Sequence, residues 1–266
     1  MKREDFEALG TKHKLYEQRY DSTLMPGLPV IVRLDGRAFH TFTKGLQRPF
    51  DPRLSAAMIS TTKHLVAEWN ASVGYTQSDE ITIAFANADP EAEFNFGGRV
   101  QKIVSLFAAS ASVKFNNIIR TSIPEKASEL PLFDARVFQY PNLDLAVENF
   151  LWRETDATRN SLTMAAHSVY STKELHKAGY VAKHDMLHAK GINWNDYPIH
   201  FKRGMYVAKR TVMKTLTDEE LQRIPPAHRE PGKMFARSVV QELNLLPLSH
   251  LANPIGVLFF AEPIIS

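Results

Sequence analysis

The stretch LPVIVRLDGRAFHTFTKG, residues 28–45, carries an apolar run that stops at one carboxylate and a glycine. The run PVIVRL, residues 29–34, has the length and composition of a buried strand, and Asp35-Gly36 is a turn signal that ends it. Basic and titratable side chains surround this acid in the sequence: Arg33, Arg37, His40 and Lys44. A lone acid at the end of a strand, among positive charges, is the first candidate for a functional residue.

The segments that follow predict an alternation of strands and helices. Residues 51–70 carry apolar residues at helical spacing behind an Asp51 N-cap and Pro52. Residues 72–86 predict a hairpin with a polar turn at 77–79 and a second strand in which Ile81, Ile83 and Phe85 share one face. A helix over 97–119 and a strand over 133–141 complete the order β-α-β-β-α-β, which is the ferredoxin-like arrangement of an α+β fold.

This order predicts that three carboxylates meet at one edge of the sheet. A right-handed crossover makes the first two strands parallel, and the third strand lies between them in the opposite direction. The end of the first strand then lies beside the start of the third. Asp35 is therefore expected next to Asp79 and Glu80, although 44 positions separate the two aspartates.

Converging carboxylates favour a metal-dependent reaction on phosphate. Acids a few ångströms apart repel one another unless a cation or protons lie between them, and hard oxygen ligands suit Mg²⁺. Two ions spaced about 3.5–4 Å apart serve phosphoryl or nucleotidyl transfer. Positive partners for phosphate are also present: Arg33, Arg37, His40, Lys44, Arg48, and Lys102 in the opening turns of the second helix.

Each of these signals is weak by itself. Asp-Gly after a strand is usually only a turn, and Ser-Asp-Glu in a hairpin is commonly solvated. Their placement at one predicted sheet edge is what favours nucleotidyl chemistry over these ordinary interpretations.

Composition limits the remaining classes of protein. The chain has 266 residues, 44% of them hydrophobic, which suits a globular domain with a substantial core. The formal net charge of +3 is too small to establish an anionic partner. Cys is absent, which excludes disulfides, thiolate catalysis and sulfur-ligated zinc. No signal peptide or stretch of about 20 apolar residues is present, so a cytoplasmic protein without a membrane partner is expected.

Several motifs in a fixed order resemble one family of enzymes. RLDGRAFHTF, RPFDPRL, GYTQSDEITIAF, FDARVFQYPN and WRETDATRN are similar to elements of the histidine-tRNA guanylyltransferase family and its Thg1-like branch, the 3′-to-5′ RNA polymerases. The likeness spans about residues 28–210. It implies a polymerase-palm-like core, a Mg²⁺-dependent nucleotidyltransferase with ATP, GTP and other nucleoside triphosphates as substrates, tRNA as partner, and a homotetramer.

The resemblance assigns roles to individual positions. Asp35, Asp79 and Glu80 match the catalytic acids, and Asp35, Asp79 and the Gly36 carbonyl match the ligands of two Mg²⁺ ions. The nucleotide-binding positions are Gly36, Arg37, Ala38, Phe39, His40, Arg48, Asp51, Ser78 and Lys102. Phe50 stands where the family usually has Asn, which changes the expected base or ribose contact.

A second departure separates the two branches of the family. Eukaryotic guanylyltransferases carry a His-Asn-rich element where this chain reads TRNSLTM, residues 158–164, and only Asn160 remains. This favours template-dependent repair of the tRNA 5′ end, with ATP or GTP activating that end. Untemplated addition of G to histidine tRNA, a cyclase on the same palm, and a non-catalytic RNA-binding module are the alternatives.

The second half of the chain is expected to face RNA. Residues 1–140 are predicted as the catalytic core with an N-terminal extension, and residues 141–266 as a helical, basic extension packed on it. Residues 145–180 are predicted as helical, with Arg153, Asp156, Asn160 and His167 on one stripe. Residues 180–214 interleave aromatics with basic residues in a predicted strand or loop surface. The predicted RNA-binding residues are Arg153, Asp156, Asn160, Lys183, Lys202 and Arg203.

Overall fold

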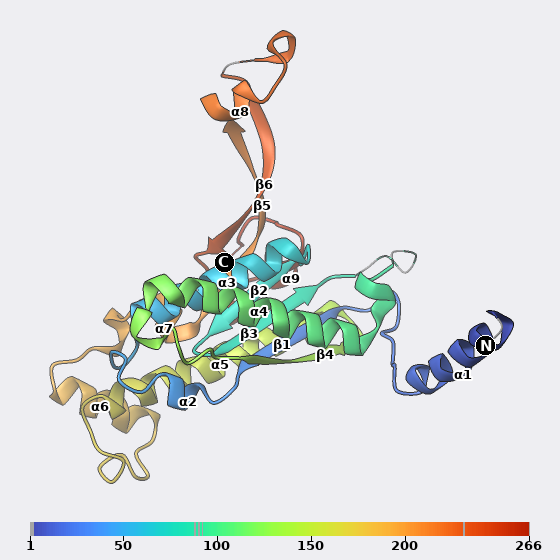
Figure 1. The fold of residues 1–266 in the computed structure, drawn as a ribbon. Helices are drawn as coiled ribbons and strands as arrows, with labels where there is room; N and C mark the ends of the chain where they lie inside the picture. Colours follow the sequence, from blue (N-terminus) through green and yellow to red (C-terminus); the bar gives the residue numbers. More distant parts are fainter. Residues whose placement is uncertain (1–2, 88, 90, 92, 231, 266) are drawn as a thin grey trace.

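The structure is a computed structural model that describes residues 3–87, 89, 91, 93–230 and 232–265 (Figure 1). Its strands are β1 Val30–Gly36, β2 Val73–Gln77, β3 Glu80–Phe85, β4 Phe133–Gln139, β5 Met205–Thr215 and β6 Met234–Leu243. Its α-helices are α1 Arg3–Gln18, α2 Phe39–Phe42, α3 Pro52–Glu68, α4 Val100–Ser122, α5 Leu143–His167, α6 Tyr180–Ala189, α7 Ile199–Arg203, α8 Asp218–Gln222 and α9 Pro254–Phe259.

Within the described residues the strands form one antiparallel sheet in the order β4-β1-β3-β2-β5-β6. β1 and β2 run parallel with β3 between them, as the sequence predicts. The register pairs Asp35 of β1 with Glu80 of β3. The mixed α/β class and the β-α-β-β-α-β order are therefore confirmed.

Two helical layers cover the sheet because the strands alternate. Ile81, Ile83 and Phe85 face one core, which α3 and α4 close; Ala84 faces a second core with Phe150 of α5. α3 begins as predicted: Pro52 occupies the first turn and the Asp51 side chain accepts a hydrogen bond from the Arg53 amide at 2.9 Å. The sheet whose edge carries the acids is therefore packed on both faces.

The second half differs from the sequence prediction in three places. The helix predicted over 145–180 ends at His167, and a turn separates it from α6. The basic stretch predicted as strand or loop is largely helical, in α6 and α7, before β5 begins after Gly204, whose φ is +81°. The apolar segment PIGVLFFAEP, residues 254–263, would be interpreted from its sequence as an added strand or an interface segment, but it contains the buried helix α9. In these short segments the polar and apolar residues are not spaced regularly enough to distinguish a helix from a strand.

β5 and β6 add to β2 and then leave the body as a long hairpin (Figure 1). Beyond the residues of β5 that pair with β2, most residues of this hairpin are exposed. α8 follows β5 and begins with a capping box between Thr217 and Glu220. Because β5 hydrogen-bonds to β2, the sheet is continuous across the predicted boundary at residue 140.

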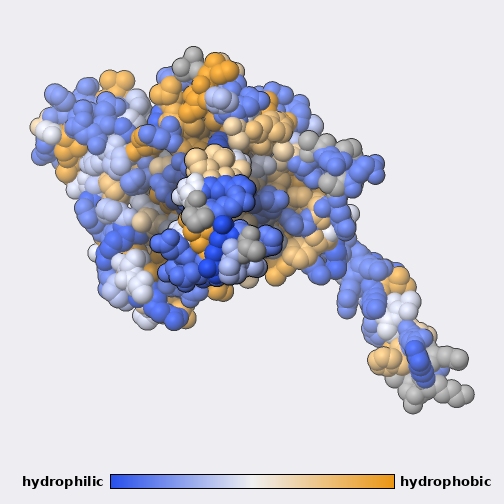
Figure 2. Space-filling model, turned by 90° about the horizontal axis from the view of Figure 1, so that it is seen from above, coloured by the Kyte–Doolittle hydropathy of each residue, from blue (hydrophilic) through white to orange (hydrophobic). Residues whose placement is uncertain are grey.

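The N-terminal helix α1 also stands clear of the body (Figures 1 and 2). Phe6, Leu9 and Tyr16 on it are 63%, 43% and 53% exposed. Among the described residues, no helix has the length and apolarity that crossing a bilayer requires.

Candidate functional site

The three predicted acids meet at one edge of the sheet. Asp35 lies at the end of β1, with Glu80 opposite it on β3 and Asp134 opposite it on β4. The Gly36 amide donates a hydrogen bond to the Asp79 carbonyl at 3.0 Å, which ties the end of β1 to the β2–β3 turn. Asp35, Asp79 and Glu80 line a common pocket of about 340 Å³. The topology has brought together residues that the chain separates.

Both aspartates resist ionisation in this setting. Burial raises the pKa of Asp79 above its usual 3.8, and the charges of Asp35 and Glu80 add to this effect. Burial, followed by the charges of Glu80 and Asp134, raises the pKa of Asp35. Carboxylates held together with so little solvent are stabilised by a bound cation.

The loop after β1 is built around the buried ring of Phe39. The Phe39 ring packs on Phe115 and Phe133, with ring centroids 5.5 and 5.2 Å apart, and a Cβ atom at Gly36 would lie 2.4 Å from it. Phe39 therefore belongs to the core, and only its backbone can face a nucleotide. Ala38 has a φ of +57°, while Arg37 and His40 are exposed. In the predicted nucleotide-binding loop, the backbone of 36–39 and the side chains of Arg37 and His40 are therefore the groups that could contact a nucleotide.

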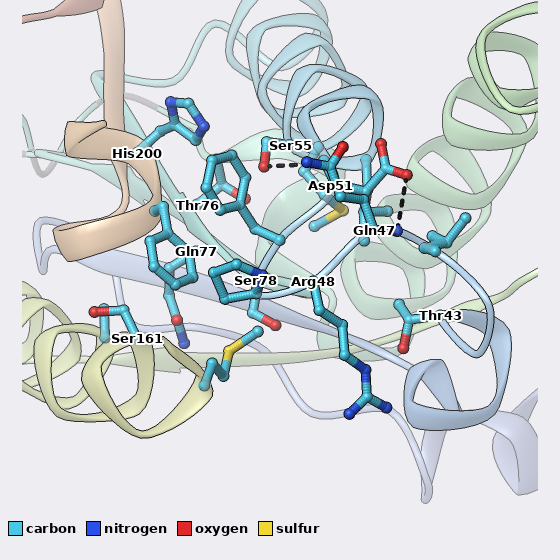
Figure 3. Close-up of a pocket in the computed structure, with 18 of the residues that line it drawn as sticks. Thr43, Gln47, Arg48, Asp51, Ser55, Thr76, Gln77, Ser78, Ser161 and His200 are labelled. Carbon is cyan, nitrogen blue, oxygen red and sulfur yellow. Dashed lines mark hydrogen bonds between the residues drawn. The ribbon is translucent and has the colours of Figure 1, made fainter. Parts of the chain in front are cut away.

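A second cavity of about 300 Å³ adjoins the acid pocket (Figure 3). Its walls come from the loop 40–51, α3, the end of β2, α5 and α7. Both spaces are lined by Gln77, Ser78, Thr163 and Met164, so they share a wall. In Figure 3, His200 and Ser161 lie on one side and Thr43 on the other, with Ser78 and Arg48 between them. Arg48, Ser78 and His40 line this cavity. They could therefore contact a nucleotide whose phosphates lie beside the acids.

Asp51 lines this cavity but is fully engaged by the protein. Both of its oxygens accept hydrogen bonds from the Arg53 guanidinium, at 3.1 and 2.8 Å. The Gln47 amide also donates to it, at 3.4 Å (Figure 3). These hydrogen bonds hold the pKa of Asp51 below its usual value. The structure gives Asp51 the role of helix cap and loop anchor.

The predicted polar stripe on α5 faces the acids. Arg153 is buried and forms ion pairs with Glu80 and, at 3.4 Å, with Asp156; Asn160 donates to Asp156 at 3.2 Å. All three stripe residues line the acid pocket. Glu80, predicted as a catalytic acid, therefore has a cation from α5 as its partner. His167, on the same helix, lines the neighbouring cavity.

The predicted RNA-binding basic residues all have partners within the chain. The Lys183 ammonium donates to Thr163 at 2.9 Å, beside the shared wall of the two cavities. Lys202 donates to the Asn195 carbonyl at 2.5 Å, and Arg203 donates to the Leu245 carbonyl at 3.2 Å. Lys202 thus also stabilises the turn before α7, and Arg203 joins the end of α7 to the segment after β6.

Lys102 is not brought to the acids within one chain. β3 starts at Glu80 and ends at Phe85, and the Phe85 ring contacts Phe107 of α4 at 6.3 Å. The first turns of α4 therefore lie at the end of the sheet away from Glu80. The Lys102 ammonium lies 5.8 Å from the centre of the Phe96 ring.

Two other features of the pocket were not predicted from the sequence. Thr163 follows Asn160 by three positions and continues its stripe, so helical spacing was a usable signal. Phe201 lines the nucleotide-sized cavity beside Phe50. Its only signal was membership of an aromatic and basic stretch, which does not indicate which ring faces the site.

Metal ligands are limited to a small set. Within the part of the chain that the structure describes, no group of three or more His, Cys, Asp or Glu side chains is arranged to hold a metal ion. The predicted set contains only two carboxylates and a backbone carbonyl, and the third acid, Glu80, is paired with Arg153. A metal here depends on Asp35, Asp79 and the Gly36 carbonyl.

Comparison with known proteins identifies the relatives of this chain. Residues 10–141 match the family described as tRNAHis guanylyltransferase (Thg1). The tRNA(His) guanylyltransferase of Debaryomyces hansenii is 30% identical over 206 residues, which cover 71% of this chain and 76% of that protein. The chain belongs to the tRNA(His) guanylyltransferase family. The predicted resemblance is thereby confirmed.

Solved structures of the family extend the match over almost the whole chain. A bacterial tRNA(His) guanylyltransferase (Thg1)-like protein in complex with ATP is 32% identical, with a TM-score of 0.80 over 96% of this chain and 100% of that chain. Such a protein in complex with GTP is 32% identical, with a TM-score of 0.69 over 91% and 94% of the two chains. Membership of this family supports nucleotidyltransferase activity of the guanylyltransferase kind and a role in tRNA processing.

The Arg153–Glu80 pair in this family member has a measurable energetic signature. Arg153→Met leaves Glu80 and Asp156 without their cation in a largely buried site, so we expect the free energy of unfolding to fall by about 3 kcal/mol. Glu80→Gln in the same background should restore part of this loss. Urea denaturation of the wild type, both single variants and the double variant measures the coupling. Strictly additive effects would show that the two side chains do not interact.

Proposed function

We propose that this chain adds nucleotides to the 5′ end of tRNA in the 3′-to-5′ direction, choosing each nucleotide by pairing with the opposite strand. The observation that carries this proposal is the pair Asp35 and Asp79, which have raised pKa values and line one pocket beside a cavity of about 300 Å³. The retained family motifs around them support the chemistry. The loss of the His-Asn-rich element at residues 158–164 supports templated repair over untemplated addition of G.

Two Mg²⁺ ions would be held by Asp35, Asp79 and the Gly36 carbonyl. This donor set is all oxygen, and the raised pKa values of both aspartates indicate a site that gains stability from added positive charge. When bound, the ions supply positive charge against the transferring phosphoryl group. The contribution of the chain is to fix the two carboxylates on adjacent elements through the Gly36–Asp79 backbone hydrogen bond.

Nucleotide binding divides between the two cavities. Arg37, His40, Arg48 and Ser78 would bind the triphosphate on the side nearest the acids, and the rest of the cavity of about 300 Å³ would take the base and ribose. ATP or GTP would activate the tRNA 5′ end, and the 3′-hydroxyl of the incoming nucleotide would then attack it. The relatives described as complexes with ATP and with GTP support both nucleotides as ligands. Lys102 would contribute only from another subunit or after rearrangement.

The tRNA would lie along α5 and the elements after it. Arg153, Asp156 and Asn160 border the acid pocket, and Lys183 stands beside the shared wall. In this proposal residues 1–140 provide the catalytic core and residues 141–266 the surface that positions RNA. We propose a cytoplasmic homotetramer on the basis of the family resemblance.

The direct test is incubation with a tRNA shortened at its 5′ end, Mg²⁺ and labelled nucleoside triphosphates. Elongation of the 5′ end that requires the tRNA, Mg²⁺ and a nucleoside triphosphate together supports the proposal. Conversion of a nucleoside triphosphate without RNA would indicate a cyclase. Binding of tRNA without any elongation would indicate an RNA-binding module.

Replacing Lys202 and Arg203 with Ala should weaken tRNA binding and leave nucleotide affinity nearly unchanged. For each positive charge removed from a phosphate contact, the slope of log affinity against log salt concentration should become shallower by about one. Because both side chains also bond within the chain, thermal unfolding of the double variant must be measured alongside. Lys214→Ala, on the exposed end of β5, is the matched control. An unchanged salt dependence would assign both residues a structural role only.

A further inference from the structure

Helix α5 places one cation inside the acid pocket. Among the lining residues that the structure describes, Arg153 is the only one with a positive charge. Its side chain is 7% exposed, and it pairs with Glu80 and, at 3.4 Å, with Asp156. The guanidinium carbon also lies 4.6 Å from the centre of the Trp152 ring. Three neighbours therefore hold the guanidinium in place.

The helix that carries Arg153 is itself anchored. Glu154, the next residue, is buried. Its carboxyl oxygens accept hydrogen bonds from the Tyr206 hydroxyl at 3.0 Å and from the Leu248 amide at 3.1 Å. These hydrogen bonds tie α5 to β5 and to the segment after β6. Arg153 is therefore presented to the acids by a fixed element and not by a loose loop.

Glu80 has the position of a third metal ligand. It lies opposite Asp35 on the neighbouring strand, and its charge helps to raise the pKa of both Asp35 and Asp79. The affinity of an oxygen site for a divalent cation depends on the number of charged ligands that it offers. The ion pair with Arg153 occupies Glu80, and the positive charge of Arg153 repels any other cation in the same pocket. Asp35 and Asp79 are then the two carboxylates left for a metal.

We propose that Arg153 is a positioning residue that keeps Glu80 away from the metal and so weakens the binding of divalent cations to the substrate-free pocket. This inference rests on the proposed function, because it takes Asp35 and Asp79 as ligands of Mg²⁺. A cation with only two carboxylate ligands needs further oxygens, and a nucleoside triphosphate supplies them. The pocket would therefore hold its ions firmly only together with a nucleotide.

The test measures equilibrium binding of Mn²⁺ by electron paramagnetic resonance, with no nucleotide or RNA present. Mn²⁺ prefers the same oxygen ligands as Mg²⁺. Arg153→Met frees Glu80 and removes a like charge, so we expect it to tighten Mn²⁺ binding by about tenfold. A damaged fold could only weaken binding, so tighter binding separates this role from a purely structural one.

Arg136→Met is the matched control for the loss of charge. Arg136 lies near enough to Asp35 to lower its pKa, but it is exposed and pairs with Asp134 instead of Glu80. Because an exposed charge is screened by salt, this substitution should change Mn²⁺ affinity by less than about threefold.

Variants of Glu80 test whether the effect passes through this carboxylate. In a Glu80→Gln background, Arg153→Met should change Mn²⁺ affinity by less than about threefold, because no third carboxylate is released. Glu80→Gln alone should weaken binding by less than about tenfold, because the wild-type carboxylate is not a direct ligand. This variant keeps the Arg153–Asp156 pair and so tests the inference even if Arg153→Met does not fold.

The outcomes separate this inference from the proposed function. Wild-type elongation of a shortened tRNA, together with a Mn²⁺ affinity that a folded Arg153→Met variant does not tighten, would overturn the inference alone. So would an equal gain from Arg153→Met with Glu80 present or replaced, since charge repulsion alone would explain it. A larger loss of affinity in Glu80→Gln would show that Glu80 already binds the metal, with the same consequence. Absence of Mn²⁺ binding in both the wild type and Arg153→Met would overturn the metal site of the proposed function as well.

Discussion

Asp79→Ala and Asp35→Ala should each lower the rate of nucleotide addition by about a thousandfold or more. Each substitution removes an oxygen ligand from the proposed Mg²⁺ site, and charge stabilisation of this kind contributes several kcal/mol to the transition state. Neither change opens a cavity in the apolar core, because both side chains lie in the polar pocket at the sheet edge. Single-turnover rates with saturating nucleotide and tRNA measure the effect on chemistry.

Asp134→Ala is the matched control for both variants. Asp134 pairs with Asp35 across β1 and β4, but it is exposed and its carboxylate lies 3.6 Å from Arg136. Its removal should leave the rate within a few-fold of wild type. Thermal unfolding without metal should show Asp79→Asn no less stable than wild type, because an amide avoids the desolvation cost of the carboxylate and its repulsion by Asp35 and Glu80. A folded Asp79→Ala variant with near-normal turnover would remove the metal site from the mechanism.

The sheet edge could be predicted because it depends on order and handedness alone. Four short strands and two helices of clear periodicity fix which strand ends are neighbours, and Asp35 then falls beside Glu80 without any knowledge of packing. The N-cap at Asp51 was predictable for a similar reason, since capping is a local interaction between adjacent residues.

What the side chains do at that edge was not predictable from the sequence. The pairing of Glu80 with Arg153 joins β3 to α5 across 73 positions, and sequence spacing carries no information on that contact. The burial of the Phe39 ring depends on the rings of Phe115 and Phe133. Lys102 was expected at the phosphates because helix N-termini bind anions, but this helix starts at the other end of the sheet.

The long hairpin of β5 and β6 illustrates a different limit. Its tip carries mixed polar and apolar residues, with Met213 56% exposed and Met234 55% exposed, so no run of buried residues marks these parts of the strands. Only the base of the hairpin packs on the body. When paired strands are not buried, their sequence needs no regular apolar pattern, so they are difficult to predict.

A tRNA shortened at its 5′ end should be extended opposite any of the four template bases, with the added nucleotide set by Watson-Crick pairing. The acids and phosphate-binding positions of the family are kept at Asp35, Asp79 and Arg48, whereas the His-Asn-rich element is replaced by TRNSLTM at residues 158–164. In the structure this segment lies on α5, where Asn160 and Thr163 border the acid pocket. We therefore expect the chemistry of the family to be retained and its nucleotide specificity to differ.

Four truncated tRNAs that differ only in the template nucleotide, each supplied with each nucleoside triphosphate, measure this choice. Matched pairs should exceed mismatched ones by about tenfold to a hundredfold, since a pairing mismatch costs about 1–3 kcal/mol. A full-length tRNA with no unpaired template base is the control and should accept little further nucleotide. Incorporation of GTP alone, whatever the template base, would instead assign the chain to untemplated guanylyl addition. In that case the altered element on α5 would not be the residue set that separates the two reactions, and the selectivity for G would have to arise in the nucleotide pocket itself.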